Sequence, residues 1–430
     1  MRRLIALALL VTAAVLVRRT MALDAAADLR DTALAFGFAL IAAALAGEIF
    51  ERMRLPRISG YLVFGIACGP YAGDLISRSM AVDLQQVNGL AIALIAFVAG
   101  LEMNLARLRE TIGAISRLGA AVLGGSLLLF SVLLLAGWSF LPLPEVPSLA
   151  ERAVIAVILA LLVVSFSPTV SLAVIAESRA RGPLTDLVLP LVILADLVLI
   201  VLFALLLQAA RAVSGAAHEG DVGLVALLSW ELLGSLAFGG LMGAAFAIYL
   251  RHVGREVTLV LLGLCVVLAG VGQALHFEIV LASLTAGLVV ENIAPPEGDA
   301  LKHAVERGAL PVLIVFFVAA GASLQLDVLA EVGLVALVLA IARGGALWAT
   351  SRAGLAWSGL PAEPGRLVWN GLVSQGGVTL GLASLVATEF ASWGPPAYTL
   401  VIALTALHVL AGPVMFRKAL ADAGEVGKDE

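Results

Sequence analysis

Residues 154–175 read VIAVILALLVVSFSPTVSLAVI, an apolar run that carries the tetrapeptide SFSP at positions 165–168. About 20 apolar residues suffice for a helix to cross the hydrocarbon core of a bilayer. Pro168 has no N–H to donate, and its ring clashes with the carbonyl four residues earlier, so the helix is expected to break here. Irregular backbone at membrane depth is tolerated only where it is buried in protein or lines a cavity. This stretch therefore predicts a broken membrane helix beside a functional site.

A second break is predicted in residues 367–387, LVWNGLVSQGGVTLGLASLVA, where Gly376 and Gly377 follow one another. Each glycine lowers helix preference by about 1 kcal/mol relative to alanine. The first break lies in the fifth apolar run of the chain and the second in the twelfth, so the two helices run in opposite directions. Matching breaks in opposed helices indicate an inverted-repeat transporter. The alternative is an ordinary proline kink and a glycine packing notch, with no transport role.

Composition supports a membrane protein, because 61% of the residues are hydrophobic and only 13% are charged. A soluble domain carries about 25% charged residues. We predict an all-α, polytopic membrane protein with about thirteen transmembrane helices. The expected spans are 32–50, 58–76, 87–103, 118–141, 154–175, 184–209, 222–250, 257–275, 277–293, 309–324, 328–348, 367–387 and 397–416.

Basic residues gather in alternate connections between these spans. Connections such as 52–57, 107–117 and 179–181 are basic, whereas 389–396 contains no lysine or arginine. Basic loops are cytoplasmic by the positive-inside rule, which places the C-terminus in the cytoplasm. We expect three parts. They are a signal-like or extra anchoring segment at 1–30, a membrane transporter domain at 31–418, and a short cytoplasmic tail at 419–430, polar and disordered after Arg417.

Two charged residues fall inside predicted spans. Asp196 is near the centre of LPLVILADLVLI (189–200), and a central aspartate costs roughly 2.5–3.5 kcal/mol on insertion scales. Such a carboxylate is by default a proton-relay or ion site, with an interhelical hydrogen bond as the alternative. Arg343 keeps its proton and needs an anion or carbonyl oxygens nearby. We expect it to neutralise Asp196 in part or to stabilise the broken helices, with snorkelling to the membrane interface as the alternative. His408, in the last span, is interpreted as a core histidine. The alternative is a symmetry partner of Asp196 in the inverted repeat, because 31 residues separate Gly377 from His408 and 28 separate Pro168 from Asp196.

No phosphate-binding loop, HExxH or GxSxG pattern is present in the sequence. We therefore predict no enzymatic activity and no organic cofactor. The net charge of −5 gives no indication of a nucleic-acid partner. Cys68 and Cys265 lie in apolar runs without a CxxC pattern and are expected to be buried filler.

Five short motifs, in order along the chain, resemble the monovalent cation–proton antiporter superfamily, in particular its second branch of bacterial sodium/proton and potassium-efflux exchangers. They are LPRISGYLVFG (55–65), FVAGLEM (97–103), SP (167–168), FFVAAG (316–321) preceded by Pro311, and SQGG (374–377). The resemblance covers about residues 31–418. It implies a scaffold part interleaved with a mobile core part that contains two crossed, discontinuous helices.

The resemblance places Asp196 at the family's second ion-binding position and Arg343 at its intramembrane lysine or arginine. Ala195 departs from the first position, which is usually Asp, Asn or Gln. The predicted cation- and proton-binding residues are Asp196, Ser165, Ser167 and Thr169, with Arg343 compensating charge and with Gln375, Gly376, Gly377 and Thr379 in the second crossover helix. Asp196 is the expected ligand of an alkali ion.

The predicted function is antiport of a monovalent cation, sodium or potassium, against protons by alternating access. Burial disfavours a bare carboxylate, so either a proton or a cation stabilises it and the two compete. One exchangeable proton predicts electroneutral exchange. The resemblance further implies a cell membrane location, which is the inner membrane in a bacterium, and a homodimer in the lipid bilayer. The alternatives are an organic-anion transporter on the same scaffold, with Arg343 binding the anion, and a non-transporting membrane sensor.

Overall fold

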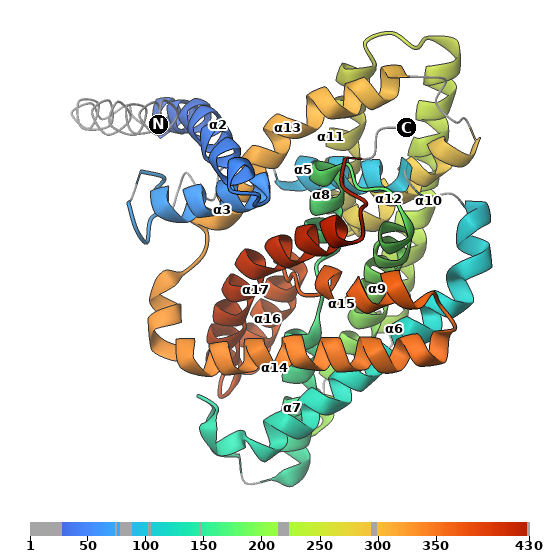
Figure 1. The fold of residues 1–430 in the computed structure, drawn as a ribbon. Coiled ribbons are helices and arrows are strands. Elements are labelled where there is room, and N and C mark those ends of the chain that lie inside the picture. The colour runs from blue at the N-terminus through green and yellow to red at the C-terminus, as the bar shows by residue number, and fades with distance from the viewer. Residues whose placement is uncertain are drawn as a thin grey trace. The chain divides into compact units, whose positions relative to one another are not determined.

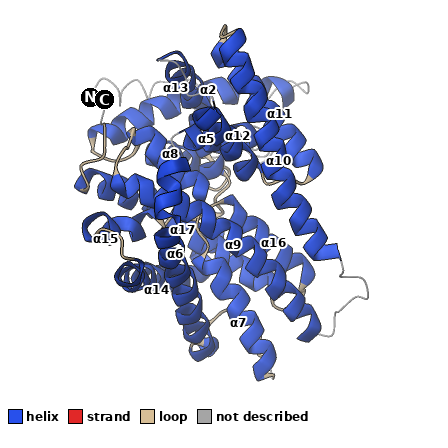
Figure 2. Cartoon of the chain, turned by 90° about the vertical axis from the view of Figure 1, so that its right-hand side faces the viewer, coloured by secondary structure: helices blue, strands red, loops and turns tan. Residues whose placement is uncertain are grey.

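A computed structural model describes residues 28–73, 75–77, 88–101, 103, 105–146, 148–213, 223–293 and 299–427 of the 430-residue chain. Across these ranges every regular element is a helix (Figure 2). The helices shown in Figure 1 are α2 (Asp28–Arg52), α3 (Arg57–Cys68), α5 (Asn88–Leu101), α6 (Leu105–Ala136), the 3₁₀ turn η1 (Trp138–Phe140), α7 (Leu149–Val164), α8 (Pro168–Ser178), α9 (Pro183–Val213), α10 (Gly223–His252), α11 (Val257–Leu275), α12 (Ile279–Ile293), α13 (Asp299–Ala322), α14 (Leu326–Ser358), α15 (Ala362–Gly371), α16 (Gly377–Glu389) and α17 (Gly394–Asp422).

The all-helical, multi-pass prediction is confirmed. In the described part of the chain, seven helical segments are long and apolar enough to cross a membrane, and five further apolar helices are shorter. Each of the thirteen predicted spans overlaps one helix or one pair of half-helices. The count of thirteen crossings itself stays a prediction. Of the segment expected at 1–30, residues 1–27 lie outside the described residues.

Three predicted boundaries were wrong. The span expected to reach Ile76 ends at Cys68, because the chain turns back at Gly69 and the amide of Ile76 donates to the carbonyl of Cys68 at 2.7 Å. Helix α6 begins at Leu105 rather than residue 118, and α14 continues to Ser358 rather than stopping at residue 348. Hydropathy detects only the apolar middle of such helices, whose polar ends continue into water with the same backbone geometry.

The helices form two compact units. Unit 1 comprises residues 1–103, 176–178 and 234–324, and unit 2 comprises residues 104–175, 179–233 and 325–430. Each unit draws on both halves of the chain. All residues of the predicted ion site lie in unit 2.

Unit 1 contains two helix pairs whose backbones come into close contact. A Cβ atom on Gly65 of α3 would collide with the carbonyl of Val318 on α13, and one on Gly321 would collide with the carbonyl of Leu62. The pair formed by α5 and α12 repeats this reciprocal arrangement at Gly100 and Gly287. Only glycine lets two helix backbones approach this closely. The repetition fits the inverted repeat that the sequence predicted.

Unit 2 is built around α7, α9, α14, α15, α16 and α17. The long helices α6 and α14 pack against each other, and the hydroxyls of Ser126 and Thr350 lie 3.0 Å apart in that contact. The tail was predicted to be disordered after Arg417, and this was wrong for its described part, to residue 427. Helix α17 continues to Asp422, and the Glu425 side chain beyond it is only 1% exposed.

Candidate functional site

The first broken helix consists of α7 and α8, joined by the extended residues Ser165–Ser167. Pro168 opens α8, where its missing N–H costs nothing because the first amides of a helix have no intrahelical acceptor. The Ser167 hydroxyl accepts from the amide of Val170 at 3.4 Å and so caps α8. The predicted site residue Thr169 is half-buried in the first turn of α8.

The second broken helix consists of α15 and α16, joined by residues 372–376. Gly377 begins α16, and a Cβ atom there would meet nothing within 4 Å. A Cβ atom on Gly376 would instead lie 2.5 Å from the Ser167 hydroxyl of the first break. Gly376 is therefore required for the close approach of the two breaks.

The two breaks cross in direct contact. The amide of Ser167 donates to the carbonyl of Ser374 at 2.9 Å, and the hydroxyls of Ser165 and Thr379 lie 2.6 Å apart. Another hydroxyl bond, from Ser171 to the carbonyl of Gly371, measures 2.8 Å. Each break thus supplies partners for backbone groups that the other leaves outside a helix. This confirms two crossed discontinuous helices.

Arg343 of α14 holds both breaks by their carbonyls. Its side chain is fully buried and donates to Val373 at 2.6 Å, to Ser165 at 2.7 Å and to Leu372 at 3.0 Å. These carbonyls follow the C-terminal ends of α7 and α15. Helix C-termini carry partial negative charge, which a buried cation stabilises. Of the two roles expected for Arg343, this geometry corresponds to stabilisation of the broken helices.

Gln375 forms a second polar bridge between the breaks. Its amide nitrogen donates to the carbonyls of Leu162 at 3.1 Å and Val163 at 2.8 Å, in the last turn of α7. The amide oxygen lies 2.9 Å from Nδ1 of His408 on α17. Since the amide nitrogen already faces two carbonyls, the oxygen must accept, so Nδ1 of His408 carries the proton.

Asp196 lies in the middle of α9 and is 4% exposed. Helix α9 packs against α6, α7 and α15, so the carboxylate is carried by a helix adjacent to both broken helices. The preceding residue, Ala195, is also buried. Pro190 interrupts the hydrogen bonding of α9 without ending the helix.

One contact network therefore contains Ser165, Ser167, Gln375, Gly376, Thr379 and Arg343. Asp196 lies on α9, which packs against α7 and α15, whereas Thr169 lies in the first turn of α8 and Gly377 begins α16. Sequence reasoning missed His408 as a partner and missed Ser171. The similar spacing from each break to Asp196 and to His408 was the one available signal for the histidine.

The oxygen atoms of Ser165 and Ser167 differ in the number of hydrogen bonds that they already make. The Ser165 hydroxyl donates to Leu162 at 2.9 Å while contacting Thr379, and the Ser165 carbonyl binds Arg343. The Ser167 hydroxyl accepts the longer bond from the amide of Val170, at 3.4 Å. No cluster of three or more His, Cys, Asp or Glu residues suited to a metal ion occurs among the described residues. A carboxylate with hydroxyl and carbonyl oxygens is the ligand chemistry of a hard cation.

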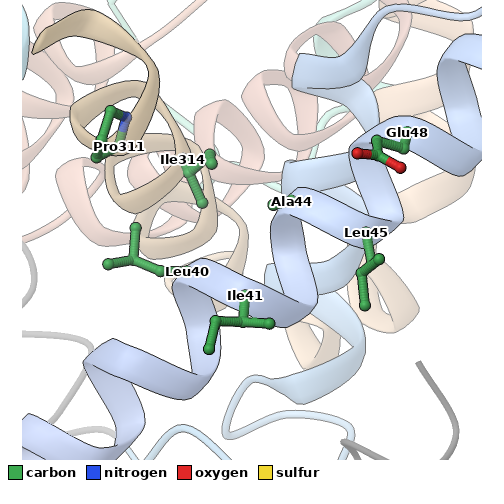
Figure 3. A pocket seen from close by; sticks show the side chains of 7 residues that line it. All are labelled: Leu40, Ile41, Ala44, Leu45, Glu48, Pro311 and Ile314. Atoms are coloured by element: carbon green, nitrogen blue, oxygen red, sulfur yellow. The ribbon is translucent and has the colours of Figure 1, made fainter. Parts of the chain in front are cut away.

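A separate hollow of about 420 Å³ lies between α2 and α13 in unit 1 (Figure 3). Its lining is apolar except for Glu48, and it includes Pro311 of the fourth motif. None of the predicted ion-site residues contributes to it.

Comparison with known proteins adds a family and a fold. The family described as sodium/hydrogen exchanger, transmembrane, matches residues 37–420. A structure of the sodium proton antiporter MjNhaP1 from Methanocaldococcus jannaschii at pH 8 aligns with a TM-score of 0.65 and 17% identity, covering 93% of this chain and 100% of that one. An electron-microscopy structure of MjNhaP1 aligns with a TM-score of 0.71 and 19% identity, covering 92% and 98%. At this identity the two structures show a shared fold.

Proposed function

The chain belongs to the sodium/hydrogen exchanger family, and on this premise we propose that Asp196 is the group at which its cation and proton exchange. Membership makes the chain a cation:proton antiporter in a membrane. The observation that carries the proposal is the position of Asp196, 4% exposed on the helix that packs against α7 and α15. A carboxylate buried among membrane-spanning helices is by default a proton-relay or ion site.

The cation is held by oxygen atoms. Asp196 supplies the charge, and Ser167 and Thr169 of the first break supply neutral oxygens. Ser165 and Thr379 hold the breaks together, which fixes where the other oxygens lie. Gln375, Gly376 and Gly377 shape the second crossover.

Competition for one carboxylate couples the two fluxes. Binding of an alkali ion displaces the proton, and protonation displaces the ion. Either loaded form is neutral at Asp196 and can change its exposure between the two sides. The bare anion cannot, because moving an uncompensated charge through a low-dielectric region is unfavourable.

The charge count predicts electroneutral exchange. Ala195 provides no second acid, and Arg343 is occupied by three carbonyls and does not release its proton. One proton is therefore exchanged for one monovalent cation. Sodium is the cation favoured by the family, and potassium stays an open alternative within the same chemistry.

The remaining predictions concern assembly and placement. Unit 2, which contains the whole proposed site, corresponds to the core part implied by the resemblance, and unit 1 to the scaffold part. A homodimer, a bacterial inner-membrane location and a cytoplasmic C-terminus are proposed on the same resemblance and on the distribution of basic loops.

Two other functions are disfavoured. An organic-anion transporter needs Arg343 to be open to an anion, yet its guanidinium is fully buried and donates to three carbonyls. A sensor that has lost its ion site does not require a buried acid on a helix that packs against both broken helices. The family match also supports transport over both.

Reconstituted vesicles test the function directly. Addition of lithium, sodium or potassium outside vesicles with a pH dye inside should produce a saturable pH change for at least one cation. An imposed membrane potential should leave the rate unaltered if exchange is electroneutral. A rate that follows the imposed potential would rule out one-for-one exchange, and no cation-dependent pH change would rule out the function.

A further inference from the structure

The C-terminal tail returns to the helix that carries Asp196. The Glu425 carboxylate accepts hydrogen bonds from the amide of Leu184 at 2.6 Å and from the amide and hydroxyl of Thr185 at 2.9 and 2.7 Å. These groups form the first turn of α9. The amide of Arg181 also donates to the Glu425 carbonyl at 3.1 Å.

The connection before α9 is shaped to receive this side chain. Gly182 has φ +154°, which favours glycine, and a Cβ atom there would lie 2.6 Å from Cδ of Glu425. On the tail side, Gly424 has φ +68°, which lets the chain turn away from α17 and direct Glu425 inward. Both partners of the contact therefore use backbone conformations that suit it, and the side chain is 1% exposed.

The same helix that leads into the tail also contacts the second break. His408 of α17 is bonded to Gln375, and one turn later a Cβ atom on Gly412 would collide with Ser374. Helix α17 is thus attached at two places. One attachment fixes the crossover, and the other, through Glu425, fixes the start of α9.

A carboxylate at a helix N-terminus satisfies amides that have no intrahelical acceptor and favours the positive end of the helix dipole. Helix α9 runs from Pro183 to Val213 with Pro190 inside it, so an axial shift of its first turn would carry Asp196 with it. We propose that Glu425 is a positioning residue for transport, which fixes α9, and with it Asp196, relative to the crossover held by α17. This inference rests on the proposed role of Asp196 as the ion site.

The contact is measured independently of transport by hydrogen exchange on the reconstituted full-length protein. In Glu425→Gln one oxygen is replaced by a donor that cannot accept from Thr185, so the amides of Leu184 and Thr185 should exchange about tenfold faster. Equal exchange in wild type and variant would overturn the docking. Asp422→Asn removes one negative charge from an exposed position three residues away and should leave exchange unchanged.

Transport kinetics test the positioning role. In Glu425→Gln the KM for the transported cation should rise about fivefold while the maximal rate stays within about twofold, because ion binding depends on where Asp196 lies. The double variant Asp422→Asn/Glu425→Gln should have the same raised KM as Glu425→Gln, since loss of charge alone is not the cause. A maximal rate that falls with KM unchanged would indicate a merely structural role and would contradict the proposal.

A double-mutant cycle guards against a folding defect. Thr185→Val removes one hydroxyl from the other side of the contact and should raise KM in the same direction but less. The KM of the double variant Thr185→Val/Glu425→Gln should lie within about twofold of the KM of Glu425→Gln, because both changes remove the same interaction. Independent, multiplicative effects would overturn the coupling. The role of Asp196 is tested separately. If Asp196→Asn continues to exchange while Glu425 remains docked, the ion-site proposal fails and the docking of Glu425 does not.

Discussion

The guanidinium of Arg343 lies 2.7 Å from the backbone carbonyl oxygen of Ser165, and the same side chain reaches the second break through Leu372 and Val373. One buried cation thus serves the C-terminal ends of two half-helices that belong to different halves of the chain. The three backbone carbonyls that accept its hydrogen bonds account for an arginine at this depth. The contact makes Arg343 a stabilising element of the crossing.

Arg343→Met should lower the free energy of unfolding by about 3 kcal/mol, because carbonyls that received charged hydrogen bonds are left buried and unpaired. Arg343→Lys should lose less, since one ammonium can still donate to part of the set. Thermal unfolding in detergent measures both. A variant that keeps wild-type stability yet loses all exchange would contradict the structural role assigned to Arg343.

Gln375→Glu changes the shape of the side chain little and replaces its amide donor with a carboxylate oxygen. That oxygen would face the carbonyls of Leu162 and Val163, so two hydrogen bonds become repulsive contacts. We expect a loss of about 2–4 kcal/mol in stability and a marked fall in exchange rate.

His408→Asn, which retains a donor toward Gln375, should lose less stability and less exchange rate than His408→Leu in the same assays. The reverse order would refute the orientation of this pair.

Gly376→Ala should separate the two breaks, because its new methyl group would lie 2.5 Å from the Ser167 hydroxyl. The exchange rate should fall at least about tenfold, since the amide of Ser167 would be drawn away from Ser374. Gly381→Ala is the matched control on α16, as a Cβ atom there meets nothing within 4 Å. It should retain exchange and gain up to about 1 kcal/mol of helix stability. Equal activity of the two variants would argue against a tight crossing.

Ala195→Asp introduces a second acid next to the proposed site. If two protons then exchange for one cation, each cycle moves net charge, and the rate should respond to an imposed membrane potential. The added buried carboxylate should also reduce stability, by roughly 2.5–3.5 kcal/mol on insertion scales. Vesicles clamped at several potentials give the measurement, with wild type as the voltage-insensitive reference. Voltage dependence already present in wild type would overturn the single-acid stoichiometry.

Much of the fold could be predicted because its signals are local. Apolar runs located the helices, and Pro168 and the paired Gly376 and Gly377 located the breaks, since each residue acts on its own backbone. The ends of α6 and α14 were missed because polar helical turns do not differ in hydropathy from loops.

The partners within unit 2 depend on tertiary packing, which no local pattern encodes. An intramembrane arginine requires acceptors, but the sequence does not say whether these are Asp196 or the carbonyls near Ser165. His408 and Gln375 are separated by 33 residues and share no periodicity. Glu425 has the sequence context of a solvated tail residue, yet it is buried against Gly182, where a Cβ atom would collide with its carboxylate.

The most direct test of the account is exchange by Asp196→Asn in proteoliposomes, measured as the cation-driven change of internal pH. Asparagine has nearly the same volume but neither binds a proton at neutral pH nor offers a negative charge. The account predicts a folded protein, with size-exclusion and thermal unfolding profiles like those of wild type, and no exchange above empty vesicles. Cation-driven proton movement at the wild-type rate in this variant would contradict it.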